Sequence, residues 1–300
     1  MNLLQRSNEW KELSEWQIGT RISRPESQQC VPPFVSARQS RDTDIFMRTI
    51  LTASPSQMGC WVAKHAASDL RQAIAEHGNA NIVVATGASQ FEVLGHLVKE
   101  PDIDWSKVTG FHLDEYVGLP SDHGASFCGY LKERFVDHVD LASFHYLRGD
   151  VDPETTLRDT GELVRTRRID LALVGIGENG HLAFNDPPAD FITEDPYLVV
   201  ELDEPCRLQQ VGEGWFESLA SVPTHAISMS VRQILKAAKI YCSVPDERKA
   251  EAVRATLEGP ITPEVPASIL REHPNATLVI DEAAASRISD DVRSQLEDGE

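Results

Sequence analysis

The strongest constraint on the fold of this chain is a recurrence of short, almost continuously apolar runs, each followed by a segment with helical periodicity. A short apolar run suits a strand that is buried on both faces of a sheet. Helices between successive strands favour parallel pairing, because each helix carries the chain back across the sheet. The sequence therefore predicts an α/β fold: a single Rossmann-like domain with a mostly parallel sheet and helices on both faces.

The predicted elements alternate from residue 47 onwards. We expect the first helix to begin at Ser54 or Ser56, either of which can cap a helix that has Pro55 in its first turn. Ligands of parallel sheets bind at the carboxyl ends of the strands, so we expect functional residues in the loops that follow them. The predicted strands are 47–53, 81–85, 108–114, 169–174, 240–244 and 277–280. The predicted helices are 54–75, 91–98, 131–136 and 246–257.

Residues 1–46 differ from the rest of the chain. They contain few apolar residues in any period, and 21–41 is rich in Arg, Ser, Gln and Pro, which disfavours a packed core. We predict a poorly ordered N-terminal extension over 1–46, one folded domain over 47–290 and an acidic tail over 291–300. The strand-like run starts at Met47, which is therefore a candidate for the natural start of the protein.

The charge balance narrows the classes of partner. The chain has 28 Lys and Arg residues against 47 Asp and Glu residues, a formal net charge of −19. We therefore expect neither nucleic acid nor a membrane as a partner. A small phosphate ligand remains compatible, because it needs only a few backbone amides and one or two cations.

Cysteine usage and hydropathy indicate the compartment. No Cys-x-x-Cys pair occurs, which indicates neither a zinc site nor a disulfide framework and predicts a reducing, cytoplasmic location. No apolar stretch approaches the roughly 20 residues that span a bilayer. The five cysteines are Cys30, Cys60, Cys128, Cys206 and Cys242.

Four residues, Thr86, Gly87, Ala88 and Ser89, join a predicted strand to a predicted helix. Gly87 permits a tight turn, and Ser89 can cap the helix, whose exposed N-terminal amides favour an anion. The segment is a candidate phosphate cradle. It also fits a plain strand-to-helix turn, because Thr-Gly-x-Ser alone is a weak signal.

Asp114 stands where another predicted strand ends. Period-two alternation places His112 and Asp114 on one face of this strand and Phe111 and Leu113 on the other. A carboxylate that is partly removed from water there can act as a general base with a raised pKa. Taken alone, a solvated strand end in an acidic protein is the better interpretation of this residue.

The loop 175–187 concentrates unusual residues. Gly175, Gly177 and Gly180 permit a backbone that approaches a ligand closely. His181 and Asp186 can form a paired acid and base across a turn. The loop matches neither a phosphate-binding Walker motif nor the dinucleotide-binding glycine fingerprint. A glycine-rich loop with an incidental histidine is the alternative interpretation.

Cations and further histidines complete the candidates. Arg248 and Lys249 follow a predicted strand and can bind phosphate there, as can Arg207, although each taken singly is more simply a surface charge. The remaining histidines have no ligand spacing, so we predict no metal site. They include His123, His138, His145 and His273.

These segments together resemble the glucosamine-6-phosphate deaminase/isomerase family. The matching stretches are 85–89, 111–120, 175–187 and 248–250, in the family's order and spacing, and the resemblance covers residues 47–285. The patterns DEYVGLP and GxGxxGHxxFNxP are specific only when they occur together. The resemblance implies that 47–290 is a catalytic domain.

The family's reaction turns glucosamine 6-phosphate into fructose 6-phosphate and ammonia. The resemblance implies no cofactor, because the substrate's own amine and carbonyl allow an enolamine intermediate. It implies that Asp114 is the base that moves a proton between C2 and C1, that His181 assists ring opening, and that Asp186 is the acid partner of His181. It also implies a substrate and phosphate site that comprises Thr86, Gly87, Ala88, Ser89, Gly177, Lys249 and Arg207.

The chain departs from the family pattern at three places. Asn179, a further candidate catalytic residue, stands where some members have Asp, so the charge on His181 depends more on Asp186. Asp186 is one methylene shorter than the Glu of many members and has to reach His181 across the turn. The stretch 207–215 differs from the family's usual arginine-bearing segment.

Two other functions compete with the deaminase. A 6-phosphogluconolactonase-like hydrolase shares the glycine-histidine loop, but the continuation Phe-Asn-Asp-Pro and the DEYVGLP stretch favour the deaminase. A non-catalytic sugar-phosphate sensor is disfavoured by the retention of Asp114, His181 and Asp186. In each case the expected partner is a small-molecule sugar phosphate. A homo-oligomer is left open, since members of the family vary in assembly.

Overall fold

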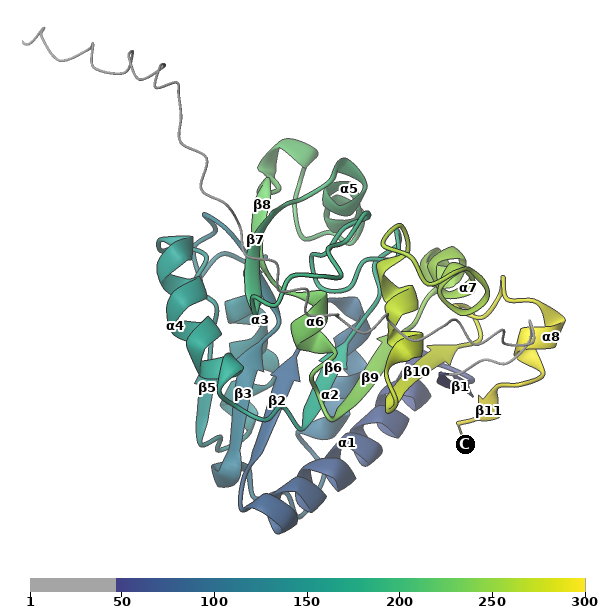
Figure 1. Cartoon of the computed structure of the whole chain (residues 1–300), viewed down its shortest axis with the longest axis horizontal. Coiled ribbons are helices and arrows are strands. Elements are labelled where there is room, and N and C mark those ends of the chain that lie inside the picture. The colour runs from purple at the N-terminus through teal and green to yellow at the C-terminus, as the bar shows by residue number, and fades with distance from the viewer. Residues whose placement is uncertain (1–46, 300) are drawn as a thin grey trace, which may run out of the picture. The chain divides into compact units, whose positions relative to one another are not determined.

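The computed structural model describes residues 47–299. The expectations for 1–46 lie outside the described residues. Eight strands form the main sheet in the order β11-β1-β10-β9-β6-β2-β3-β5, which can be followed in Figure 1. Every neighbouring pair in it is parallel, which confirms the predicted α/β fold. The strands are β1 Arg48–Thr52, β2 Ala80–Val84, β3 Val108–His112, β5 Ser143–His145, β6 Leu171–Val174, β9 Lys239–Val244, β10 Ala276–Asp281 and β11 Glu297–Asp298.

A second, antiparallel sheet has three strands in the order β4-β8-β7. It carries its own apolar cluster, in which Tyr116 of β4 packs with Phe127 and Phe184. The predictions did not anticipate this sheet. Its strands are β4 Asp114–Tyr116, β7 Tyr197–Glu201 and β8 His225–Met229.

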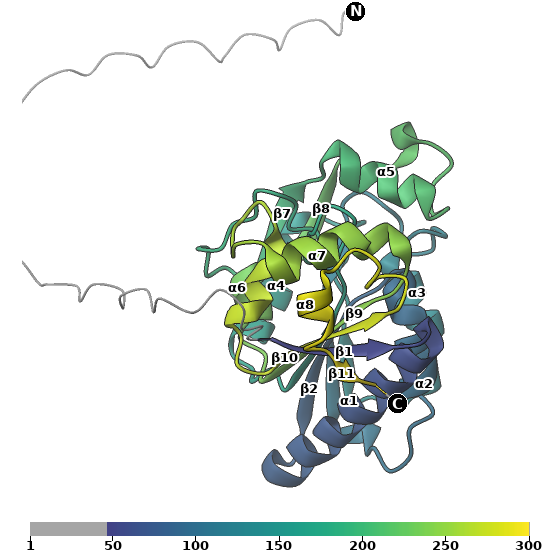
Figure 2. The ribbon, with the colours of Figure 1, turned by 90° about the vertical axis from the view of Figure 1, so that its right-hand side faces the viewer.

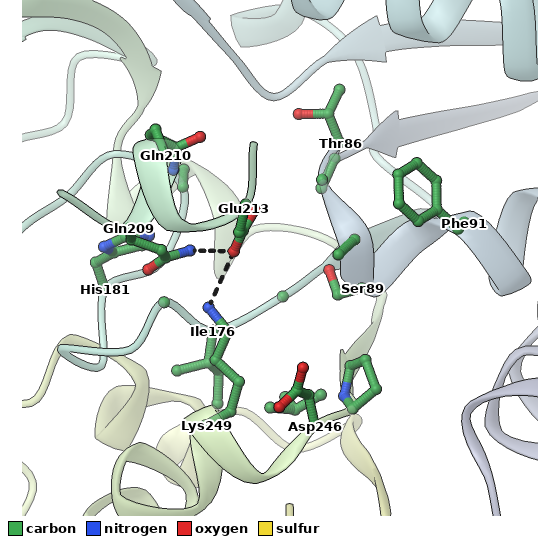
Figure 3. Close-up of a pocket in the computed structure, with 18 of the residues that line it drawn as sticks. Thr86, Ser89, Phe91, Ile176, His181, Gln209, Gln210, Glu213, Asp246 and Lys249 are labelled. Atoms are coloured by element: carbon green, nitrogen blue, oxygen red, sulfur yellow. Dashed lines mark hydrogen bonds and ion pairs between the residues drawn. The ribbon is translucent and has the colours of Figure 1, made fainter. Parts of the chain in front are cut away.

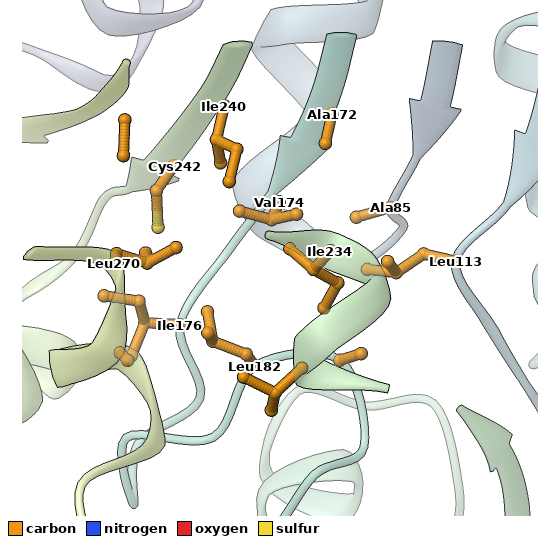
Figure 4. Packing of buried hydrophobic residues seen from close by; sticks show 14 of the residues in the cluster. Ala85, Leu113, Ala172, Val174, Ile176, Leu182, Ile234, Ile240, Cys242 and Leu270 are labelled. Atoms are coloured by element: carbon orange, nitrogen blue, oxygen red, sulfur yellow. The ribbon is translucent and has the colours of Figure 1, made fainter. Parts of the chain in front are cut away.

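Helices cover both faces of the main sheet because the strand residues alternate between two apolar clusters. Ile82 and Val84 of β2 face α1 and α2. Val174 of β6 and Ile240 of β9 belong to the opposite cluster with Ile234 of α6 (Figure 4). The helices are α1 Pro55–His77, α2 Phe91–Leu97, α3 Phe127–Arg134, α4 Pro153–Arg165, α5 Glu204–Gly212, α6 Val231–Ile234, α7 Ala250–Glu258 and α8 Asp290–Arg293.

The ends of α1 follow the sequence closely. Ser54 is the N-cap, since its side chain accepts a hydrogen bond of 3.3 Å from the Gln57 N–H, and Pro55 opens the helix. The helix ends at Gly78, whose φ of 80° suits glycine. Of the two predicted caps, Ser54 is therefore the one that the fold uses.

The predicted strand 108–114 is wrong in one respect. β3 ends at His112, and Asp114 already belongs to the other sheet, where it pairs with Ser228. Leu113 makes the transfer: its N–H donates to the Val84 carbonyl at 3.2 Å, and its carbonyl accepts from the Met229 N–H at 2.9 Å. One residue thus joins the two sheets.

The segment 291–300, which the sequence set apart as an acidic tail, contributes structure through Asp298. β11 pairs in parallel with β1, beside α8 (Figure 2). Glu297 accepts hydrogen bonds from the Arg48 guanidinium at 2.7–3.1 Å. The exposed acidic residue therefore pairs with a cation at the edge of the sheet.

Membrane and redox features were searched within residues 47–299. None of the helices described there is long and apolar enough to cross a bilayer. Four cysteines in this part of the chain are unpaired thiols, namely Cys60, Cys128, Cys206 and Cys242.

Helix α1 approaches α2 most closely at Gly59. A Cβ at this position would lie 2.5 Å from the carbonyl carbon of Glu92. We expect Gly59→Ala to lower the free energy of unfolding by about 1–3 kcal/mol through overpacking. Gly95→Ala in α2 is the control: nothing lies within 4 Å of its added methyl group, so it should be neutral or stabilising by up to about 1 kcal/mol. Urea unfolding measures both, and equal stabilities would contradict the packing argument.

Candidate active site

A cavity of about 290 Å³ lies beyond the carboxyl ends of β2, β6 and β9 (Figure 3). This is the edge at which parallel sheets bind ligands. The turn 86–89 follows β2, the glycine loop follows β6, and the segment 244–249 follows β9. Helix α5 supplies a further wall that the sequence did not predict. The lining includes Thr86, Gly87, Ala88, Ser89, Asp114, Gly175, Gly177, His181, Gln209, Gln210, Glu213, Asp246, Arg248 and Lys249.

The turn 86–89 has a shape that requires glycine. Gly87 has φ 85°, in the left-handed region, and leads into the short helix Ala88–Gln90. Gln90 anchors the turn, because its amide donates to the Val174 carbonyl at 3.1 Å. A Cβ on Gly175 would lie 2.6 Å from the Ser89 hydroxyl oxygen. The turn and the glycine loop therefore fit together only while position 175 has no side chain.

Asp114 lies in the cavity wall and is 6% exposed. Burial, with a smaller contribution from the charge of Glu115, raises the pKa of Asp114 to about 8. Its buried Oδ1 has no hydrogen-bond partner within residues 47–299. This carboxyl can therefore exchange a proton near neutral pH.

Glu115 points away from the cavity and fixes the start of α3. Its buried carboxylate accepts four hydrogen bonds of 2.7–3.2 Å. Three of these come from residues at the N-terminus of α3, where an anion is favourable. Burial nonetheless raises the pKa of Glu115. The donors are the N–H groups of Tyr116, Phe127 and Cys128 and the hydroxyl of Ser126.

His181 and Asp186 form the pair that the sequence predicted. His181 Nδ1 lies 3.0 Å from Asp186 Oδ1, and both side chains are about 10% exposed or less. Asp186, although one methylene shorter than a glutamate, therefore reaches the imidazole of His181. Burial opposes ionisation of Asp186, but the bonds from His181, Asn179 and Asp203 outweigh it and lower the pKa of this carboxyl.

Asn179 forms hydrogen bonds with both His181 and Asp186. Its amide donates to Asp186 at 3.1 Å and to Asp203 at 3.3 Å, while its oxygen accepts from the His181 N–H at 3.1 Å. The Asp203 N–H donates to the other oxygen of Asp186 at 3.1 Å. Neither Asn179 nor Asp186 lines the cavity, but both contact His181, which does.

Gly177 passes directly over the His181 ring. A Cβ at this position would lie 2.2–2.4 Å from three ring atoms, which include both nitrogens. The Gly177 N–H donates to the His181 carbonyl at 3.0 Å, which closes the loop. The absence of a side chain at 177 therefore fixes where the imidazole can stand.

Lys249 reaches into the cavity, although the side chain is only 9% exposed. Its Nζ lies 3.6 Å from Glu213 Oε1. Burial lowers the pKa of Lys249, and the nearby carboxylate of Glu213 partly opposes this effect. Arg248 also lines the cavity, and its guanidinium bonds to Asp246 at 2.9 Å.

The assignment of Arg207 to this phosphate site is wrong in position. Arg207 lies on α5 and donates to the carbonyls of Leu219 and Val222 at 2.7 and 3.0 Å. It lines a separate pocket behind Asp186. Its i+3 neighbour Gln210 faces the active-site cavity instead. The sequence did not identify Gln209, Gln210 or Glu213, because α5 was not predicted as a helix.

Within residues 47–299, two trios of side chains have the atoms that could hold a metal. His112, Glu115 and Cys128 lie together, as do His181, Asp186 and Cys206. The oxygens of Glu115 and Asp186 already accept the bonds described above. Burial raises the pKa of both thiols, which disfavours the thiolate that a metal needs. These residues therefore fit a hydrogen-bonded role better than a metal-binding one.

The chain matches the family described as glucosamine-6-phosphate isomerases/6-phosphogluconolactonase over residues 53–279. It is 38% identical to a glucosamine-6-phosphate deaminase of Exiguobacterium sp., covering 71% of this chain and 82% of that protein. It is 34% identical to a glucosamine-6-phosphate deaminase of Thermoanaerobacter pseudethanolicus, covering 84% of this chain and 99% of that protein.

Solved structures agree with these matches. A monomeric glucosamine-6-phosphate deaminase superposes with a TM-score of 0.73 at 32% identity, over 80% of this chain and 99% of that one. A 6-phosphogluconolactonase from Trypanosoma brucei superposes with a TM-score of 0.68 at 14% identity, over 81% of this chain and 99% of that one, and so shares the fold alone. With the matched region spanning both sheets and the loops around the cavity, this chain belongs to the glucosamine-6-phosphate isomerase/6-phosphogluconolactonase family.

Proposed function

We propose that this chain is an enzyme that converts glucosamine 6-phosphate and water to fructose 6-phosphate and ammonia. The observation that carries the proposal is one cavity that holds a proton-accepting carboxyl, Asp114, and the paired imidazole of His181. The similarity to glucosamine-6-phosphate deaminases over most of the chain supports the same substrate.

In the proposed reaction, His181 first assists ring opening by moving a proton between the O1 hydroxyl and the ring oxygen. Asp186 is negatively charged and 3.0 Å away, so it stabilises the imidazolium that forms when His181 takes up a proton. Asn179 holds Asp186 in place for this step. Asp186 and Asn179 are therefore positioning residues, which act on the substrate through His181.

Asp114 then moves the proton between the carbon atoms. Its carboxylate removes the proton from C2 of the open-chain sugar to give an enolamine, and the resulting acid returns that proton to C1. Water adds to the imine now at C2, and ammonia leaves. The raised pKa makes Asp114 a stronger base than an ordinary aspartate.

We assign the phosphate of the substrate to the part of the cavity wall formed by the turn 86–89 and Lys249. The turn from Thr86 to Ser89 and the ammonium of Lys249 border the same cavity. Backbone amides and a partly buried cation suit a phosphate monoester. The cytoplasmic location and the homo-oligomer stay predictions; the solved relative is described as monomeric.

The direct test is turnover. Purified protein incubated with glucosamine 6-phosphate should release ammonia and fructose 6-phosphate in equal amounts. Hydrolysis of 6-phosphogluconolactone without deamination would favour the lactonase, and tight binding without turnover would favour the sensor.

Asp114→Asn removes the proposed base without changing the size of the side chain. We expect kcat/KM to fall by roughly 10²–10⁴-fold. The matched control is Asp190→Asn, which makes the same change at an exposed carboxylate outside the cavity. Equal loss in the two variants would remove Asp114 as the base.

The pH dependence follows from the same carboxyl. The base form predominates only above the raised pKa, so kcat/KM should increase with pH and level off above about 8. A profile that is flat from about pH 6 to 8 contradicts this assignment.

The pH dependence of protein stability tests the raised pKa of Asp114 in the absence of substrate, whose amine could affect a kinetic pH profile. An unfolded aspartate has a pKa of about 3.9, whereas burial raises that of Asp114 to about 8. Between these values only the folded state keeps the proton, so the wild type loses stability relative to Asp114→Asn as pH rises, by at most about 1.4 kcal/mol per pH unit. Urea unfolding at several pH values measures the difference, and a constant difference contradicts the raised pKa.

Gly177→Ala tests the placement of the imidazole. The added methyl group would overlap the His181 ring and force it to move. Because a displacement of about 1 Å can cost roughly 100-fold in rate, we expect a loss of that order in kcat. Gly161→Ala in α4, where nothing lies within 4 Å of the added methyl group, should retain activity. Wild-type activity in Gly177→Ala would show that His181 need not stand where it does.

A further inference from the structure

The cation assigned to the phosphate already has an anion beside it. Figure 3 shows Glu213 pointing toward Lys249 from the end of α5, with the ion pair drawn as a dashed line. Their charged atoms are 3.6 Å apart, and the two side chains are 9% and 8% exposed. Both groups line the active-site cavity.

Glu213 is held in this position by two further contacts. Gln209 donates to Glu213 Oε1 at 2.8 Å, and the Trp215 indole N–H donates to Oε2 at 3.2 Å. Gln209 is itself fixed, because its side-chain oxygen accepts from the Glu178 N–H at 3.0 Å. These hydrogen bonds therefore fix the Glu213 carboxylate in the wall of the cavity.

A phosphate cannot use Lys249 without meeting this carboxylate. Two anions that share one ammonium in a partly buried site repel each other by more than they would in water. Arg248 relieves the conflict only in part, because Asp246 engages two of its guanidinium nitrogens and its side chain is 44% exposed. The Glu213 carboxylate therefore opposes a phosphate at Lys249 unless it moves away or loses its charge.

We propose that Glu213 sets the affinity of this site for phosphate: its carboxylate occupies the anion position at Lys249, and the phosphate of the substrate has to displace it. This inference rests on the proposed function, because it takes Lys249 to be the phosphate ligand. Unphosphorylated sugars do not compete for the ammonium, so Glu213 affects phosphorylated ligands alone.

Glu213→Gln removes the charge and keeps the shape. Calorimetric titration of the full chain with inorganic phosphate should give a Kd about tenfold lower than in the wild type, the effect of roughly 1.4 kcal/mol of relieved repulsion. The KM for glucosamine 6-phosphate should fall in the same direction, while binding of unphosphorylated glucosamine should not change. The control is Glu217→Gln, which makes the same charge change at an exposed residue outside the cavity. Unchanged or weaker phosphate binding in Glu213→Gln overturns the inference.

A measurement on the wild type avoids any effect of the substitution on folding. The indole N–H resonance of Trp215, assigned with Trp215→Phe, reports the bond to Glu213. It should shift as inorganic phosphate saturates the site, and a resonance that stays in place contradicts displacement.

The two proposals fail in different ways. If the wild type deaminates its substrate but Glu213→Gln binds phosphate no better, only the inference about Glu213 falls. If the wild type shows no turnover but Glu213→Gln binds phosphate more tightly, only the deaminase proposal falls. If the wild type shows no turnover and neither protein binds phosphate, both fall.

Discussion

The site depends on the transfer of the chain from one sheet to the other at Leu113. Its N–H is paired with β2 of the main sheet, and its carbonyl with the residue that ends β8 of the small sheet. The next residue, Asp114, is thereby held by backbone pairing at the boundary between two sheets, where its side chain is removed from water. The raised pKa of Asp114 follows mainly from this burial, with a smaller contribution from the charge of Glu115.

Other charged groups in the cavity or directly next to it are paired. Asp186 lies against His181, Lys249 against Glu213, and Arg248 against Asp246. A buried charge is tolerated when a partner or a set of hydrogen bonds compensates for its lost hydration. Asp114 lacks such a bond at Oδ1 among the described residues, so it is the carboxyl whose protonation state is easiest to change.

The sequence predicted those parts of the site whose structure depends on residues close together in the chain. The apolar runs of β2, β6 and β9, the cap at Ser54 and the glycine loop were each readable within a few residues. The small sheet was not, because β4 has only three residues, two of them acidic, and its pairing with β8 and β7 joins distant parts of the chain. Arg207 was misplaced for a similar reason: without α5, nothing indicated that it turns away from the cavity while Gln210 turns in.

Helix α5 joins the two halves of the site. At its N-terminus Asp203 caps the helix and also bonds to Asp186 and Asn179, behind the imidazole. At its C-terminus Glu213 meets Lys249. Because Asp203 and Glu213 flank the same nine-residue helix, α5 connects the surroundings of the His181–Asp186 pair with those of Lys249. The stretch 207–215, in which this chain differs from the family pattern, supplies Glu213 beside Lys249 and Gln209 beside the glycine loop.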